Sequence, residues 1–142
     1  MILLGAAKIL LTAFLRKPCT KPVRDAYDLT QMQFNILMFL HNNPQFDTAG
    51  DLVKTRHLTK SHVSTALKEL EARGWIEAHY AAGNRKSQHL RITKSAEAVI
   101  AAGKAAQEVF GKQLFKGFTP RETEQYKVLF DKMCENAAEG LA

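Results

Sequence analysis

The stretch Leu58–Glu77, LTKSHVSTALKELEARGWIE, decides the fold of this chain. Its apolar residues recur at the i, i+3, i+4, i+7 spacing of an amphipathic helix, which predicts a helix over Lys60–Arg73 with one buried face. Gly74 follows directly, and glycine readily adopts the left-handed conformation that ends a helix. The predicted buried residues are Val63, Ala66, Leu67 and Leu70.

The opposite face of this helix carries mostly short hydrogen-bonding side chains in its N-terminal half. Ser and Thr are poorer helix formers than the Glu and Lys that usually cover a solvated helix, so their presence indicates a use other than helix stability. The acids Glu69 and Glu71 are confined to the C-terminal half. The pattern predicts a surface that fits into a groove, formed by Lys60, Ser61, His62, Ser64, Thr65 and Lys68.

Two further helices are predicted before this one. Leu29–Phe34 combines an N-cap Thr30, a Gln three residues later and a hydrophobic staple, which together mark a helix start. That helix should stop before Pro44 and bury Phe34, Leu37, Met38 and His41. A short helix then opens at Thr48 and ends at residue 54 or 55, and a turn leads into the helix described above.

Two short strands with a basic connection are predicted after the helix. Apolar and polar residues alternate over Trp75–Tyr80 and over about Gln88–Ile92. The connection, residues 81–87, is expected to be a flexible tip that carries the adjacent cations Arg85 and Lys86. A solvated hairpin with incidental charge is one interpretation. Because the hairpin directly follows a helix with a polar outer face, we favour a wing that contacts a phosphate backbone or a minor groove.

Both ends of the chain are predicted to be helical and apolar on one side. Apolar residues recur at helical spacing over 2–14, and Thr93 should cap a long helix. A capping box at Thr119–Glu122 begins a last helix, whose apolar stripe runs from Tyr126 to Ala137. Three such helices exceed what a winged-helix core needs, so a homodimer interface built from both chain ends is predicted. An intramolecular bundle is the alternative.

The elements predict one mainly α domain over 1–142 with a small β-wing. Residues 29–93 would form a winged helix-turn-helix core, and 1–28 and 94–142 would form the dimerisation helices. A length of 142 residues with 46% hydrophobic side chains suits one domain. The apolar opening is too short to span a bilayer and is a poor signal peptide, because Lys8 interrupts it. The cytoplasm is the expected compartment, and no membrane partner is expected.

The net charge of +6 is concentrated in one segment. Lys54–Lys94 holds nine Lys and Arg against three acids, and the rest of the chain is neutral. Four of the five histidines also fall there. A basic segment in a neutral frame is expected of a protein that binds a polyanion such as nucleic acid, although a solvated face would look the same without the helix pattern.

The two cysteines form neither a disulfide framework nor a metal-binding spacing. Cys134 falls on the apolar stripe of the last helix and is expected in the core. Cys19 lies between Pro18 and Thr20 with lysines nearby, a setting that would suit an exposed, reactive thiol. We favour an inert Cys19, with the reactive thiol as the alternative.

The sequence resembles the multiple-antibiotic-resistance regulator (MarR) family of bacterial dimeric repressors. LTQMQFNIL at 29–37 resembles the family's LT-x-x-Q-F-x-I-L opening, the stretch at 58–77 its turn and recognition helix, and NRKSQHLRIT at 84–93 its wing and exit. The resemblance covers nearly the whole chain and is dense from Leu29 to Lys94. It implies a homodimer that binds an inverted-repeat operator in double-stranded DNA, with the polar helix face, Arg85 and Lys86 as contacts.

The resemblance also implies release from DNA by a small phenolic, lipophilic or oxidant signal, as in many members. Family ligands often lie between the dimer helices and the DNA-binding core, where this chain would offer aromatic walls and a few polar groups. The same residues would also serve as ordinary core. They are Phe14, Arg16, Phe34, Met38, His41 and Phe110.

Three positions depart from the family pattern. Asn84 stands where the family usually has an acidic residue that orients the wing arginine. Lys86 replaces a second arginine, which keeps the charge and loses the planar fork. Arg56 stands where the family often has an apolar residue, so the packing of the helix before the turn differs there.

Other classes of function are disfavoured by what the sequence lacks. An enzyme would need a phosphate loop, a nucleophile elbow or a carboxylate pair, so no catalytic residue and no cofactor are predicted. A zinc-responsive regulator of the same fold is an alternative because histidines are many, but His57 and His62 are five apart and no metal-ligand spacing occurs, so no metal ligand is predicted. A winged-helix protein-interaction module, the last alternative, would not need Arg85, Lys86 or an acid-free helix face.

Overall fold

The computed structural model describes residues 10, 13, 18–56 and 58–142. Most of the predicted N-terminal helix over 2–14 and the turn residue His57 therefore lie outside the described residues, as does the side chain of Arg56. The chain divides into two compact units, Met1–Val109 and Phe110–Ala142.

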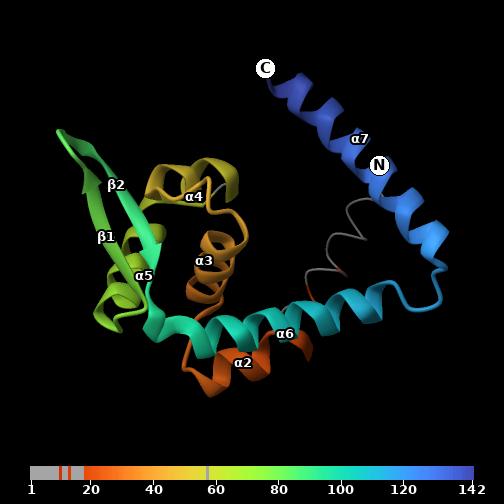
Figure 1. The fold of residues 1–142 in the computed structure, drawn as a ribbon, viewed down its shortest axis with the longest axis horizontal. Coiled ribbons are helices and arrows are strands. Elements are labelled where there is room, and N and C mark those ends of the chain that lie inside the picture. Colours follow the sequence, from red (N-terminus) through yellow and green to blue (C-terminus); the bar gives the residue numbers. More distant parts are fainter. Residues whose placement is uncertain (1–9, 11–12, 14–17, 57) are drawn as a thin grey trace. The chain divides into compact units, whose positions relative to one another are not determined.

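Helices and one two-stranded sheet follow one another in the order of a winged helix (Figure 1). The predicted fold class, mainly α with a small β-wing, is confirmed. The elements are α2 (Lys21–Ala26), α3 (Gln31–Asn42), α4 (Ala49–Arg56), α5 (Lys60–Ala72), β1 (Ile76–Ala81), β2 (Asn84–Ile92), the 3-10 turn η2 (Lys94–Ala96), α6 (Glu97–Leu114) and α7 (Pro120–Leu141).

Helix α3 begins at the predicted capping box. Thr30 Oγ1 accepts from the Gln33 backbone N–H at 3.1 Å, and Gln33 Oε1 accepts from the Thr30 backbone N–H at 2.9 Å. Of the side chains predicted to be buried here, Phe34, Leu37 and Met38 are buried. The prediction for His41 is wrong: it is exposed, because it lies in the last turn of α3, beside hollows at the surface of the unit.

Helix α5 agrees closely with its prediction. Its buried residues are the four predicted, with Leu70 fully inaccessible. Gly74 follows the helix with a φ of 73°, the left-handed conformation that a C′ glycine adopts at little cost. The buried face of α5 belongs to a hydrophobic cluster that includes Leu37 of α3, Leu52 of α4, Ile76 and Leu90 of the strands, and Val99 of α6.

The hairpin is longer and tighter than predicted. Strand β2 begins at Asn84, so only Ala82 and Gly83 connect the strands, with Gly83 at a φ of 77°. The expected flexible tip over 81–87 is therefore wrong. The pairs Ala81↔Asn84 and Tyr80↔Gln88 enclose a break in register, and residues 85–87 form a bulge between them.

The base of the hairpin is fastened to the residues before α4. Leu90 N–H donates to the Asp47 carbonyl at 2.7 Å, and Thr48 forms an isolated antiparallel bridge with His89. The ring of His89 also lies against the Asp47 carboxylate, with Nδ1 2.9 Å from Oδ1. Because the hairpin pairs with the segment that leads into α4, the wing and the short helix are held in one frame.

Thr93 does not cap α6 as predicted. Its hydroxyl donates instead to the Gly74 carbonyl, and η2 separates it from the α-helix. Further along, α6 passes α3 closely at Gly103. A Cβ at this position would lie 2.5 Å from Met38 Sδ and 3.3 Å from Phe34 Cε2, so the close packing of the two helices requires a glycine or a shift of Met38.

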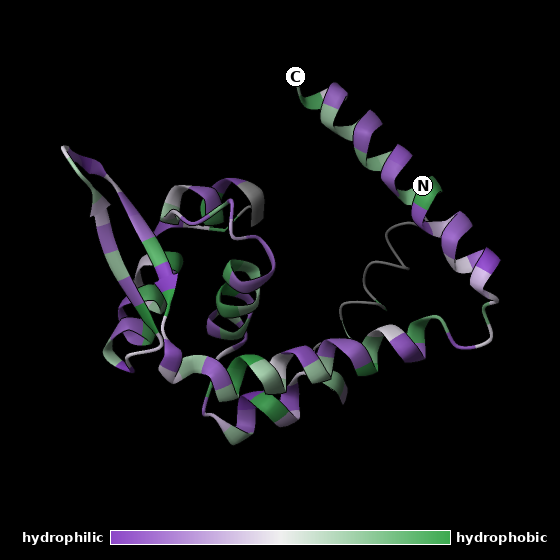
Figure 2. Cartoon of the chain, viewed as in Figure 1, coloured by the Kyte–Doolittle hydropathy of each residue, from purple (hydrophilic) through white to green (hydrophobic). Residues whose placement is uncertain are grey.

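The second unit contains the end of α6 and α7. Gly117, at a φ of 85°, breaks the helix as predicted, and Thr119 and Glu122 form the predicted capping box at 3.2 and 2.7 Å. No residue of α7 is buried, and apolar and polar residues alternate along it in Figure 2. The predicted stripe is present and is not covered by the rest of its own unit: Tyr126, Leu129, Phe130 and Met133 are 42%, 62%, 44% and 55% exposed.

The prediction for Cys134 is wrong, and for Cys19 the structure contradicts the exposed, reactive interpretation and agrees with the inert one. Cys134 is exposed, because the stripe of α7 on which it lies is not covered within its own unit. Cys19 is buried, only 6% exposed, next to the fully buried Thr20 at the start of α2. A buried thiol is poorly placed to meet an oxidant.

Truncation of the α5 core face should destabilise the first unit strongly. Leu70→Ala removes a side chain with no exposed surface and is expected to lower the free energy of unfolding by about 2–5 kcal/mol. Glu71→Ala, its exposed neighbour on the same helix, should change it by less than about 0.5 kcal/mol. Denaturant unfolding at one fixed protein concentration compares the two; an equal effect of both would contradict this packing.

Candidate nucleic-acid interface

The polar face of α5 is exposed along its N-terminal half, as predicted. None of its six candidate residues is covered by another part of the described chain: Lys60, Ser61, His62, Ser64, Thr65 and Lys68 are all exposed. The Thr65 hydroxyl donates to the Ser61 carbonyl at 3.1 Å. This bond uses the hydrogen of Thr65 and leaves its oxygen able to accept a hydrogen bond from outside.

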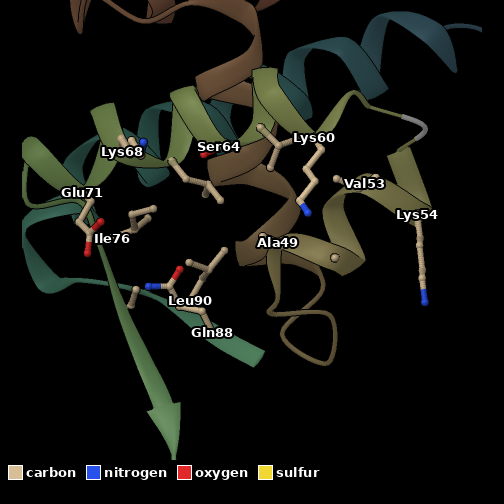
Figure 3. Close-up of a pocket in the computed structure, with 14 residues that line it drawn as sticks. Ala49, Val53, Lys54, Lys60, Ser64, Lys68, Glu71, Ile76, Gln88 and Leu90 are labelled. Carbon is tan, nitrogen blue, oxygen red and sulfur yellow. The ribbon is translucent and has the colours of Figure 1, made fainter. Parts of the chain in front are cut away.

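This surface divides into two rows. Lys60, Ser64 and Lys68, spaced by four residues, line a hollow between α5, α4 and the hairpin, whereas Ser61, His62 and Thr65 lie outside it. Figure 3 shows that the hollow collects side chains from all of these elements. The two rows therefore offer different surroundings: one faces a partly enclosed space, and the other faces away from it.

The hollow has a volume of about 510 Å³, an apolar floor and a charged rim. Core residues form the floor, among them Val63, Leu67, Ile76 and Leu90. Lys54, Lys60 and Lys68 line it against one acid, Glu71. Figure 3 shows Lys60 extending into the hollow and Lys54 extending away from it, and the excess of lysines over carboxylates makes this space suited to an anion.

Sequence reasoning missed two residues of this rim, Lys54 and Gln88. The sequence pattern places Lys54 at the end of a short helix and Gln88 at the start of a strand, and neither position indicates a site. The excess of positive charge over 54–94 is the only signal for Lys54. No sequence signal places Gln88 beside α5, because its position depends on how the hairpin folds back on the helix.

The wing presents its two cations from the bulge in β2. Arg85 and Lys86 are exposed, and neither forms an ion pair with a carboxylate of the described residues. Asn84 Oδ1 accepts from the Lys86 backbone N–H at 2.9 Å. Asn84 thus shapes the backbone of the bulge, a different role from that of the acidic residue in the resembling family.

The six residues predicted as an effector pocket are not assembled by the described structure. Phe14 and Arg16 lie outside the described residues. Phe34 and Met38 belong to the core of the first unit, near Gly103, whereas Phe110 is half-buried in the second unit. Exposed His41 lines smaller hollows of about 330 and 280 Å³. The effector pocket stays a prediction.

The histidines form no metal centre among the residues that the structure describes. No group of three or more His, Cys, Asp or Glu side chains there is placed to hold an ion. The nearest approach is the pair His79 and His89, whose ring centroids lie 5.8 Å apart, with Asp47 beside His89. Within the same residues, no helix is long and apolar enough to cross a membrane.

Residues 27–87 match the sequence model of the MarR family. The matched segment runs from the end of α2 into the bulge of β2, and so contains all of α3, α4, α5 and β1. This segment of the chain is similar to the MarR family. The resemblance predicted from the motifs at 29–37, 58–77 and 84–93 is confirmed.

Solved structures of MarR-family proteins have the same fold. A MarR transcriptional regulator from Methanosarcina mazei is 19% identical, with a TM-score of 0.81, and the match covers 98% of this chain and 99% of that one. A MarR-family regulator from Listeria monocytogenes in complex with a 26mer DNA is 23% identical, with a TM-score of 0.77 and coverage of 96% and 87%. MepR of S. aureus in complex with DNA is 22% identical, with a TM-score of 0.70 and coverage of 93% and 94%.

Proposed function

We propose that this protein is a transcriptional regulator that binds double-stranded DNA as a homodimer. The observation that carries the proposal is the exposed, acid-free N-terminal half of α5 beside a hairpin with two exposed cations. A helix of this kind enters a major groove, where short polar side chains reach base edges. The two similar proteins with DNA in their structures support it.

The two rows of α5 have different roles in this proposal. Ser61, His62 and Thr65, outside the hollow, meet base edges in the major groove. Lys60 and Lys68, with Lys54 of α4, hold the phosphate backbone where it passes between the helix and the wing. Ser64 lies in the same row as these lysines and donates to a phosphate oxygen.

The wing adds positive charge to the proposed interface and senses the width of the minor groove. Arg85 and Lys86 reach an adjacent minor groove or its phosphates from the bulge, and Arg85 favours a narrow groove with its stronger negative potential. The hydrogen bond from Lys86 N–H to Asn84 limits the conformations of the bulge, so the two side chains leave the backbone in a set direction.

The homodimer is built from residues 1–28 and 94–142 in this proposal, with 29–93 as the DNA-binding core. The uncovered stripe of α7 supports it, because soluble monomers rarely expose large contiguous apolar patches. A two-fold axis places two α5 helices on half-sites one or two helical turns apart, so the operator is an inverted repeat. Such a dimer in the cytoplasm acts as a repressor when its operator overlaps a promoter.

Regulation by a small molecule or an oxidant completes the proposal. A ligand releases the repressor only if it binds the DNA-free state more tightly than the DNA-bound state. Of the two thiols, Cys134 is exposed in the single chain and lies on the α7 stripe proposed for the dimer interface, where its oxidation would act on the dimer. The repressor role and the signal are the parts that rest on the resemblance alone.

The division of roles predicts two kinds of variant. Arg85→Ala combined with Lys86→Ala should weaken binding to every duplex and reduce the salt dependence, by about 0.9 in the logarithmic slope for each phosphate that is no longer neutralised. Thr65→Ala or His62→Ala should cost about 1–3 kcal/mol on a duplex enriched from a random pool and little on its scrambled version. Fluorescence anisotropy at several salt concentrations measures both.

Lys104→Ala is the matched control, because it removes one exposed positive charge on α6 that is not among the proposed DNA contacts. It should leave both the affinity and the slope close to those of the unaltered protein. A wing double variant with an unchanged slope would contradict the role of the wing. Helix variants that weaken both duplexes equally would contradict base reading by α5.

The proposed dimer predicts twice the 15.9 kDa chain mass in light scattering at micromolar concentration. Leu129→Glu combined with Met133→Glu places two charges on the α7 stripe and should give a folded monomer with weaker DNA binding. Val128→Glu, on the opposite face of the same helix, adds one charge away from the stripe and should leave the dimer intact. A stable dimer in the double variant would show that α7 does not form the interface.

A further inference from the structure

The C-terminal half of α5 is fastened to the junction between α2 and α3. Arg73, the C-cap of α5, donates from Nη1 to the Tyr27 carbonyl and from Nη2 to the Asp28 carbonyl, both at 2.6 Å. The Asp28 carboxylate lies 3.7 Å from the same guanidinium. One planar side chain thus holds two consecutive carbonyls of the junction, a geometry that its forked donors suit.

The junction is shaped around this contact. Asp28 has a φ of 50°, in the left-handed region that residues other than glycine seldom adopt and that surrounding contacts must maintain. The Arg73 guanidinium lies 4.7 Å from the centre of the Trp75 ring, and Trp75 meets Tyr27 edge to face at 6.2 Å. The contact therefore joins the end of α5, the start of the hairpin and the junction.

A second hydrogen-bonded contact lies one turn earlier on the same face of α5. Glu69 accepts a hydrogen bond from Gln33 Nε2, and the other end of this amide, Oε1, accepts from the Thr30 backbone N–H. Gln33 is only 5% exposed, so its side chain has a set position. Glu69 and Arg73 are four residues apart and so lie on one side of the helix. Both hydrogen-bonded contacts hold the C-terminal half of α5, whereas the residues proposed to read bases, Ser61, His62 and Thr65, lie in the N-terminal half.

We propose that Arg73 is a positioning residue for DNA recognition: it sets the pose of α5 from the α2–α3 junction without touching DNA. The proposal rests on the proposed function. Helix α5 is about 20 Å long, so a rotation of about 3° around its fastened end moves the other end by about 1 Å. Hydrogen bonds to base edges do not tolerate such a shift, whereas flexible lysines follow a phosphate.

The contact of Arg73 with the Tyr27 and Asp28 carbonyls, here called the clamp, has a second consequence because of where α2 lies in the chain. Helix α2 follows the N-terminal residues that are proposed for the dimer interface, and it leads directly into Tyr27 and Asp28. A displacement of this end of the chain therefore reaches α5 through Arg73. Loss of the guanidinium should lower the discrimination between DNA sequences and leave the general affinity for DNA unchanged.

The test compares Arg73→Ala with Arg73→Lys and with Lys104→Ala, the charge control. Anisotropy is measured on the selected duplex and on its scrambled version, at a temperature where circular dichroism shows each variant folded. Arg73→Ala should bind the selected duplex about 2- to 30-fold more weakly. Its affinity for the scrambled duplex and its salt slope should stay unchanged. Arg73→Lys keeps the charge and can still donate to a carbonyl, so it should recover part of the affinity for the selected duplex. If the alanine variant does not fold, the comparison is made with Arg73→Lys alone.

Trp75, the single tryptophan, reports on the clamp without DNA. The guanidinium covers one side of its ring, so quenching of its fluorescence by acrylamide should increase in Arg73→Ala and stay unchanged in Lys104→Ala.

Equal weakening on both duplexes would overturn the proposal, because it indicates a phosphate contact or a general disruption of the structure. An unchanged ratio of the affinities for the selected and the scrambled duplex would overturn it as well. A wild-type protein that prefers no duplex would instead refute the proposed function. The clamp would then be judged by Trp75 alone, and unchanged quenching in Arg73→Ala would refute it.

Discussion

The burial of one face of α5 is the interaction on which the rest of the first unit depends. Val63, Leu67 and Leu70 join a cluster that also contains residues of α3, α4, both strands and α6. Because a helix is rigid, the burial of this face determines which side chains point outward. The outward polar row, the hollow beside the hairpin and the ties from Glu69 and Arg73 are consequences of the same packing.

Charge is distributed around this core according to position. The lysines of the hollow and the cations of the bulge lie on the side of the proposed DNA contacts, and among the described residues that line the hollow Glu71 is the single acid. Glu69 and Arg73, in contrast, are used within the protein, in contacts with Gln33 and with the α2–α3 junction. A single helix thus separates exposed charges from charges that hold the helix in place.

Local patterns could be predicted from the sequence, and tertiary relations could not. The capping boxes at Thr30 and Thr119 and the end of α5 at Gly74 each depend on a few neighbouring residues, and all were predicted correctly. The exposure of Cys134 depends on what packs against it, and its prediction was wrong, whereas for Cys19 the sequence left both an exposed and an inert thiol open. The bulge in β2 was missed because alternation predicts a strand and not its register. The contacts of Arg73 join residues far apart in the chain, and no periodicity reveals them.

In the proposed function, two copies of α5 related by a two-fold axis read DNA. Selection of bound duplexes from a random pool by the full chain tests this most directly. We expect enrichment of an inverted repeat whose half-sites are centred about 10 or 20 base pairs apart. Enrichment of no sequence, or of a single site without symmetry, would contradict it.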